Sequence, residues 1–429
     1  MKNWPVYDIL REAARRWPDN PAVHDEYGSI SFRQLLDETE ELGVQLRELG
    51  IREGMGLGMM ASNSRHFIMG LFAGVGCGAA VMPMSPLLKK PEIDSILHDA
   101  QLHAVIDDQT GTQPLETAEA LIPMKQGTFR FAFSGIDESV RFAPFVEQPA
   151  FIRFTSGTTG KSKGVVVSHR SVIERIEAAN KGLHLDSNST VVWVLPMAYH
   201  FMVSIVLYVK YGAAIAIAKD FLARNIIDIT NQYKGTLLYA SPLQIKLLAS
   251  DTTNEQLPTL KNVISTSAGI SLDVCLAFKK RFGLDVSQAY GIIEIGLPIL
   301  NYTKSAEHPE AVGYAVEGYS VDILDENYQP LPAGEVGHLG IKGPGMFDAY
   351  LLPPVLRNEV LKNGYFLTAD YASKTADGLI KVEGRSKSVI NVSGLKVFPR
   401  LSFWRPPPCG TRYSITAGCR SICIASWGT

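Results

Sequence analysis

One run of small, hydroxyl-bearing and cationic side chains has the residue types best suited to chemistry. It reads Thr155-Ser156-Gly157-Thr158-Thr159-Gly160-Lys161-Ser162-Lys163-Gly164. Backbone N–H groups of small residues can close around phosphate oxygens, hydroxyl groups add donors, and the Lys163 ammonium supplies countercharge. A mostly apolar run precedes it at residues 151–154, and a β-branched run follows at 165–167. The sequence therefore predicts a phosphate-binding loop between two strands.

The P-loop of NTPases is the obvious rival, because Gly160-Lys161-Ser162 matches the end of that motif. The first glycine of a P-loop would have to stand at position 155, where this chain has Thr155. A P-loop also leads directly into a helix, whereas residues 165–167 favour a strand. The remaining alternative is a polar hairpin that holds no ligand.

The loop resembles the signature of the adenylate-forming superfamily, which includes acyl-CoA synthetases, peptide-synthetase adenylation domains and luciferases. Further segments resemble that family in the expected order, to about residue 399. They are residues 63–86, the acyl-pocket loop 195–201, the adenine-contacting turn 267–272, the adenine-stacking segment 288–294, and 334–339, 364–370 and 384–390. The resemblance implies an acid–thiol ligase of the acyl-CoA synthetase type that binds ATP and Mg²⁺.

The resemblance also implies roles for individual residues. Tyr290 would offer an aromatic face to adenine, and Asp370, beside Arg385, would accept hydrogen bonds from the ribose hydroxyls. Glu294 would hold Mg²⁺ against the phosphates. The implied catalytic residues are Lys163, His200 and Glu294. The implied nucleotide-binding residues are Thr155, Ser156, Gly157, Thr158, Thr159, Gly160, Lys163, Gly269, Ile270, Ser271, Ala289, Tyr290, Gly291, Asp370 and Arg385.

In the implied reaction, the substrate carboxylate attacks the α-phosphorus of ATP, pyrophosphate leaves, and the acyl group of the adenylate then passes to a thiol, usually that of coenzyme A. Several positions depart from the family pattern: Ser162 replaces proline, Ala369 replaces glycine, and Ile270-Ser271 replaces Ala-Pro. Ile293 replaces a threonine whose hydroxyl meets the AMP phosphate. Losing that hydrogen bond to an anion costs on the order of 1.5–3 kcal/mol, so we expect weaker nucleotide binding or a reduced rate.

The acyl-pocket segment indicates the kind of acid. Residues 193–205 contain no Asp or Glu to pair with an ammonium group, so a fatty or aryl acid is favoured over an amino acid. His200 either gates this pocket or is a neutral core histidine. Two other functions stay open: a non-catalytic protein that binds nucleotide or acyl-adenylate, and a peptide-synthetase-like module that loads a carrier-protein thiol.

The elements around these residues predict an α/β fold with two mainly parallel sheets and a small antiparallel, barrel-like part. The expected strands are residues 104–106, 191–194, 213–218, 237–239 and 263–265. The expected helices are 91–100, 171–181, 242–250 and 272–281. From about residue 312 the strands become closely spaced, with turns at 332–334, 343–345 and 377–378.

These patterns divide the chain into domains. We expect an AMP-binding domain at residues 1–385, with α/β subdomains to about 310 and the barrel-like part at 312–385. Residues 386–399 would form a hinge, with Lys387 at its pivot or simply a solvated lysine, and begin a small C-terminal domain that is otherwise absent. Residues 401–429 contain no Asp, Glu or Lys and three of the five cysteines. We therefore interpret residues 400–429 as an aberrant, disordered tail or, alternatively, an anion-contacting segment.

Composition and net charge indicate which kind of partner the chain binds. The chain has 429 residues, 46% of them hydrophobic, and a net charge of −2, which favours a small-molecule substrate over nucleic acid. Residues 67–84 and 197–218 are apolar but interrupted, so we interpret each as a buried helix leading into a buried strand rather than a membrane span. The N-terminus lacks a secretory signal, and Cys77 and Cys275 indicate free thiols, so we expect a cytoplasmic protein.

Overall fold

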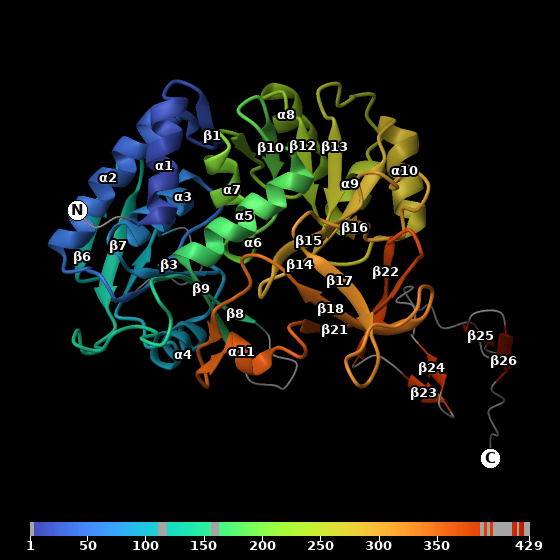
Figure 1. Ribbon diagram of the computed structural model, residues 1–429. Helices are drawn as coiled ribbons and strands as arrows, with labels where there is room; N and C mark the ends of the chain where they lie inside the picture. The colour runs from blue at the N-terminus through green and yellow to red at the C-terminus, as the bar shows by residue number, and fades with distance from the viewer. Residues whose placement is uncertain are drawn as a thin grey trace, which may run out of the picture.

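The computed structural model describes residues 4–109, 118–155 and 163–386, together with the backbone of four short strands near the C-terminus. These strands are β23 (Ile390–Val392), β24 (Leu395–Val397), β25 (Ser414–Ala417) and β26 (Arg420–Cys423). Three larger sheets form the body of the molecule (Figure 1). Residues 156–162 of the predicted phosphate loop and Lys387 lie outside the described residues.

The first sheet has the strand order β20-β19-β9-β8-β4-β3-β5-β7-β6. Its strands are β3 (Gly56–Met60), β4 (Ala80–Met84), β5 (Ala104–Asp107), β6 (Ala120–Pro123), β7 (Thr128–Phe133), β8 (Pro149–Thr155), β9 (Lys163–Ser168), β19 (Ala349–Tyr350) and β20 (Val355–Leu356). The central strands β5, β3, β4 and β8 run parallel, whereas the pairs at both edges are antiparallel.

The second sheet has the order β16-β15-β14-β13-β12-β10-β11-β1-β2 and is parallel from β1 to β14. Its strands are β1 (Pro21–Asp25), β2 (Gly28–Ser31), β10 (Thr190–Trp193), β11 (Ala214–Ile217), β12 (Leu237–Ala240), β13 (Asn262–Ser265), β14 (Val286–Ile292), β15 (Gly296–Leu300) and β16 (Tyr314–Ala315). The N-terminal hairpin β1–β2 thus extends a sheet whose other strands come from the middle of the chain.

Helices cover the sheets and fill the space between them (Figure 1). They are α1 (Pro5–Arg16), α2 (Phe32–Glu48), α3 (Arg65–Gly76), α4 (Lys90–Asp99), α5 (His169–Leu183), α6 (Met197–His200), α7 (Ile205–Lys210), α8 (Ala223–Gln232), α9 (Pro242–Ala249), α10 (Leu272–Phe282) and α11 (Arg357–Val360). Local signals set some ends: Ser31 and Gln34 form a capping box at the start of α2, and Gly283, at φ +74°, ends α10.

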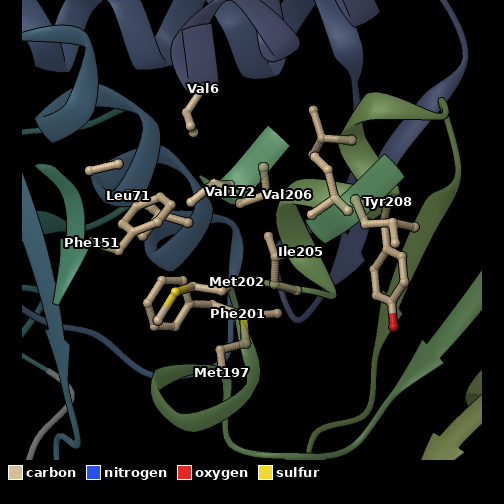
Figure 2. Close-up of a cluster of buried hydrophobic side chains, with 14 of the residues drawn as sticks. Val6, Leu71, Phe151, Val172, Met197, Phe201, Met202, Ile205, Val206 and Tyr208 are labelled. Carbon is tan, nitrogen blue, oxygen red and sulfur yellow. The ribbon is translucent and has the colours of Figure 1, made fainter. Parts of the chain in front are cut away.

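The main core joins α1, α3, α5 and α7 to β8, an interior strand of the first sheet. Figure 2 shows Val6 of α1, Leu71 of α3, Val172 of α5 and Val206 of α7 gathered around Phe151 of β8. All five side chains are fully buried. This packing fixes β8 and α5 relative to each other, and both elements contribute residues to the candidate site described below.

The third sheet is antiparallel and has the order β17-β18-β21-β22. It consists of β17 (Ser320–Leu324), β18 (Val336–Lys342), β21 (Phe366–Lys374) and β22 (Ile380–Arg385). It lies beside the β14–β15 end of the second sheet (Figure 1). The change to closely spaced antiparallel strands after residue 312 is therefore confirmed.

The predicted fold class is confirmed, and so is each predicted strand and helix, with ends shifted by one or two residues. Residues 67–84 and 197–218 are helices that lead into strands, as expected, and no helix among the described residues is long and apolar enough to cross a membrane. Cys77 and Cys275 are buried free thiols. The domain boundaries and the function of the C-terminal segment stay predictions.

Candidate functional site

A cavity of about 760 Å³ opens where the three sheets meet. Its walls come from the β8–β9 hairpin, helix α6, the β14–β15 hairpin and the segment from β21 to β22. Among the predicted site residues, five line it: Lys163, His200, Gly291, Glu294 and Arg385. These residues come from all three sheets and from α6, so the fold brings together motifs that are far apart in the sequence.

The predicted phosphate loop connects two antiparallel strands. Thr155, the last residue of β8, pairs with Lys163, the first residue of β9. A strand rather than a helix therefore follows the loop, which agrees with the exclusion of the P-loop of NTPases. Lys163 stands at the end of the loop with its side chain on the cavity wall.

Glu294 lies in the turn between β14 and β15, opposite the Lys163 strand. The Tyr350 hydroxyl donates a hydrogen bond of 3.1 Å to Glu294 Oε1, and the Lys163 ammonium lies 4.8 Å from the centre of the Tyr350 ring. Burial raises the pKa of the Glu294 carboxyl, although Tyr350 and nearby cations oppose this rise. One wall of the cavity therefore combines a hard oxygen ligand with a cation.

No group of three metal-ligating side chains occurs among the described residues. Glu294 nevertheless fits Mg²⁺, because this ion is commonly bound by one or two carboxylates, with substrate phosphates and water completing its coordination.

Arg175 of α5 holds the turn that carries Glu294. Its guanidinium is fully buried; Nη1 donates to the carbonyl of Ile293 at 3.0 Å, and Nε donates to the carbonyl of Gly345 at 2.8 Å. Nη2 has no hydrogen-bond partner among the described residues, and burial lowers the pKa of Arg175 to about 10. The sequence analysis missed this residue, although it lies on the apolar stripe of α5 that also includes Val172.

Asp370 and Tyr290 form a buried pair between the second and third sheets. The Tyr290 hydroxyl donates to Asp370 Oδ2 at 2.5 Å, and Arg385 Nε lies 3.4 Å from Asp370 Oδ1. Asp370 is only 5% exposed, and burial raises the pKa of its carboxyl, with Tyr290 and Arg385 acting in the opposite direction. Strand pairing sets this arrangement, because Asp370 of β21 is in register with Arg385 of β22.

The turn at residues 267–271 reaches the cavity through Ser267. A Cβ added at Gly269 would meet no atom within 4 Å, so the space beside this glycine is open. The Ile270 side chain packs into the core under α10, and Ser271 is the N-cap of α10. Gly269, Ile270 and Ser271 do not line the cavity. Three other predicted residues also do not line it: Ala289, Tyr290 and Asp370.

Two non-glycine residues of the cavity wall have positive φ angles. Ser267 has φ +74° and Ala369, directly before Asp370, has φ +63°. The strained backbone at Ala369 explains why glycine suits this position in the resembling family. Backbone strain of this kind clusters at functional sites.

His200 ends the short helix α6 and lines the cavity. Burial, with Arg153 nearby, lowers the pKa of His200 to about 4, so its imidazole is neutral near pH 7. Its ring lies 6.5 Å from the ring of the fully buried Trp193. His200 therefore lies on the pocket wall with a neutral ring, and its role in gating the pocket stays a prediction.

Arg153 of β8 was missed by the sequence analysis. Its Nη1 donates to the carbonyl of Ala198 at 3.0 Å, and its guanidinium carbon lies 4.3 Å from the centre of the Tyr199 ring. Burial lowers the pKa of Arg153 to about 10. The available signal was a single arginine inside the otherwise apolar run at residues 151–154.

Comparisons with known proteins agree with this geometry. A family model described as "AMP-binding enzyme" matches residues 10–351. An uncharacterised acyl-CoA ligase, YtcI of Bacillus subtilis, is 25% identical, over 91% of this chain and 76% of that protein. A long-chain-fatty-acid–CoA ligase of Escherichia coli is 24% identical, over 92% of this chain and 79% of that protein.

Among solved structures, apo MatB from Rhodopseudomonas palustris superposes with a TM-score of 0.78 at 22% identity, over 93% of this chain and 82% of that chain. This superposition shows that the chain shares the fold of MatB. The family match covers most of the chain, and the ligases above match it along nearly its whole length. The chain belongs to the AMP-binding enzyme family, as an acid–thiol ligase of the acyl-CoA synthetase type.

Proposed function

We propose that this chain uses ATP to activate a carboxylic acid that lacks an amino group and passes the acyl group to coenzyme A. A carboxylate oxygen attacks the α-phosphorus, a P–O bond forms, and the bond to pyrophosphate breaks. The thiolate of coenzyme A then attacks the carbonyl carbon and releases AMP, while the thiol proton passes to solvent. The observation that carries the proposal is the single cavity that joins Lys163, Glu294 and the segment containing Asp370.

The chain's own residues would bind and orient the reactants. Lys163 and the loop before it would hold the phosphates, where fixed cationic donors stabilise developing negative charge. Glu294, supported by Tyr350, would hold Mg²⁺, which would neutralise phosphate charge when bound. Arg175 would fix the position of Glu294 by holding the carbonyl of Ile293.

The nucleoside would lie towards the third sheet. Asp370 accepts one hydrogen bond from Tyr290, and a carboxylate with two oxygens retains capacity for ribose hydroxyls. The same hydrogen bond fixes the orientation of the Tyr290 ring, which would then stack on adenine. The open space at Gly269 would admit the edge of the adenine ring.

The absence of an amino group on the acid follows from the charges in the cavity. Glu294 is the only acidic residue among the described residues that line it. A substrate ammonium would therefore lack a dedicated partner, and burying an unpaired charge is costly. Since the free thiols Cys77 and Cys275 suit a reducing compartment, we place the reaction in the cytoplasm.

Calorimetric titration with ATP and Mg²⁺, followed by pyrophosphate exchange over a panel of acids, tests this function. Lys163→Ala and Asp370→Ala should each weaken ATP binding by about 10-fold or more, because each removes a hydrogen bond in which at least one partner is charged. Asp322→Ala is a matched control: Asp322 lies in the same sheet, accepts from Tyr365 at 2.7 Å and pairs with Lys374 at 2.5 Å, yet does not line the cavity.

The control variant should bind ATP like the unaltered chain. If the chain binds no ATP, or if the Lys163 and Asp370 variants bind it as tightly as the control, the proposed function is wrong. If ATP binds but no acid supports pyrophosphate exchange, the chain is a non-catalytic nucleotide-binding protein. Supplying coenzyme A or a phosphopantetheinyl carrier protein identifies the thiol acceptor.

A further inference from the structure

Arg153 is a cation on the cavity wall without an acidic partner in the described structure. The strand β8 lies inside the first sheet, between β9 and β4, and its neighbour Ile152 is fully buried. Among the described residues, the guanidinium donates a hydrogen bond to the carbonyl of Ala198 and lies over the ring of Tyr199. No carboxylate of the described residues forms an ion pair with it, and none influences its pKa.

The remaining acidic residues of the chain offer almost no alternative partner. Residues 156–162 and 387–429 contain no Asp or Glu, and residues 110–117 contain only Glu116. Within the cavity wall, the acidic residue Glu294 already accepts a hydrogen bond from the Tyr350 hydroxyl. Arg153 is partly buried, and a cation partly withdrawn from water is stabilised by an anion, because its desolvation is otherwise uncompensated. The anion that Arg153 lacks can come from a ligand.

The position of Arg153 on the cavity wall indicates which part of a ligand it would bind. Side chains alternate along a strand, so Arg153 lies on the same face of β8 as Phe151. Phe151 packs against Phe201 with ring centres 5.0 Å apart, and Arg153 reaches the backbone of α6 at Ala198. Arg153 therefore lies beside α6, which carries His200, and two residues along β8 from Thr155, the partner of Lys163 in the β8–β9 pairing.

The free edge of the guanidinium also suits a carboxylate. Arg153 Nη1 donates a hydrogen bond to the carbonyl of Ala198, while Nε and Nη2 form no hydrogen bond with a described residue. Nε and Nη2 together form one edge of the guanidinium plane, which matches the two oxygens of a carboxylate. The neutral imidazole of His200 stands on the same wall and carries one N–H donor.

We propose that Arg153 forms a subsite for a second carboxylate, so that the acid activated by this chain is a dicarboxylic acid. One carboxylate reacts at the α-phosphorus beside Lys163 and Glu294, and the other binds Arg153 at the α6 end of the cavity. This inference rests on the proposed function and narrows its substrate class.

The first test changes the ligand and leaves the protein unaltered. Straight-chain dicarboxylic acids of increasing length are titrated into the full chain in the presence of AMP, together with the monomethyl ester of each diacid. The ester keeps the length and one carboxylate but lacks the second charge. The best diacid should bind about 10- to 100-fold more tightly than its own ester, and its pyrophosphate exchange should show the same preference. Esters or simple monocarboxylic acids that bind as tightly as every diacid would overturn the subsite.

The second test removes the cation. Arg153→Met should abolish the preference for the diacid over its ester while leaving ester and ATP binding within about 3-fold, and Arg153→Lys should retain part of the preference. Arg33→Met is the control, because Arg33 is exposed on α2, which contributes no residue to the cavity wall. If Arg153→Met weakens diacid, ester and ATP equally, Arg153 serves the nucleotide or the reacting carboxylate, and the subsite is wrong.

The outcomes separate the two proposals. A chain that binds no ATP refutes the proposed function itself. A chain that binds ATP and monocarboxylic acids but shows no preference for any diacid refutes only the subsite. If Arg153→Met does not fold, as judged by its thermal unfolding, the comparison of diacid with ester on the unaltered chain decides the question alone.

Discussion

Replacing Ile293 with threonine should tighten AMP binding. Ile293 lines the cavity in the turn between β14 and β15, and Arg175 fixes its backbone through a 3.0 Å hydrogen bond to the Ile293 carbonyl. The resembling family has threonine at this position. A hydroxyl there would donate to the AMP phosphate, and a hydrogen bond to a charged group contributes about 1.5–3 kcal/mol. Threonine lacks the terminal carbon of isoleucine and has a hydroxyl in place of the next one; the packing lost within the protein is lost in the free and the bound state alike, so it does not enter the binding free energy.

The hydrogen bond therefore predicts a gain of about 1.5–3 kcal/mol, which corresponds to a 10- to 150-fold lower dissociation constant. Calorimetric titration with AMP measures it directly. Ile293→Val is the matched control, since valine removes the same carbon without adding a hydroxyl and should bind AMP no more tightly than the unaltered chain. Equal AMP affinities of the threonine and valine variants would refute the reasoning, because the hydroxyl would then have no phosphate within reach.

Three further predictions concern stability. Asp25→Ala should lower the free energy of unfolding by about 3–5 kcal/mol in urea titration, because it leaves the buried Arg65, now 2.6 Å from Asp25, without its counter-ion. Ala369→Gly should raise it by about 1 kcal/mol in the same assay, since glycine adopts φ +63° without strain. Burial lowers the pKa of His169 to about 4. The unfolded chain therefore binds more protons between pH 6.5 and 4, and stability should fall by up to about 3 kcal/mol as pH falls through that window; His169→Gln should lose that part of the pH dependence.

Local patterns predicted most of the fold. The parallel strands of the second sheet are short β-branched runs, and a central strand buried on both faces has little freedom to be anything else. The β8–β9 hairpin was predicted for the same reason. The β1–β2 hairpin was missed as part of that sheet, because the pairing of Val23 with Ile215 joins distant segments and leaves no local trace.

The candidate site was predicted less completely, and the omissions have a common cause. Motif residues such as Lys163 and Glu294 were found because the family resemblance marks them. Arg153 and Arg175 were missed because arginine is usually interpreted as a surface residue. Both break a local pattern, Arg153 inside an apolar strand and Arg175 on the buried stripe of α5. A charge on a face that the periodicity assigns to the core is therefore a signal that could have found them.

Several costly features of the described structure lie at the cavity, although backbone strain and unpartnered buried polar atoms also occur elsewhere. Arg175 is buried with one unpartnered nitrogen, Arg153 lacks an acidic partner, and Ser267 and Ala369 have strained backbones. The buried charge of Arg175 and the left-handed non-glycine residues cost free energy, whereas Arg153 is only partly buried and costs less. A ligand that supplies anions at the two arginines would offset the electrostatic part of this cost, while the strain would remain. The cavity walls are therefore shaped before any ligand arrives, so that binding energy goes into aligning the reacting carboxylate with the α-phosphate rather than into ordering the site.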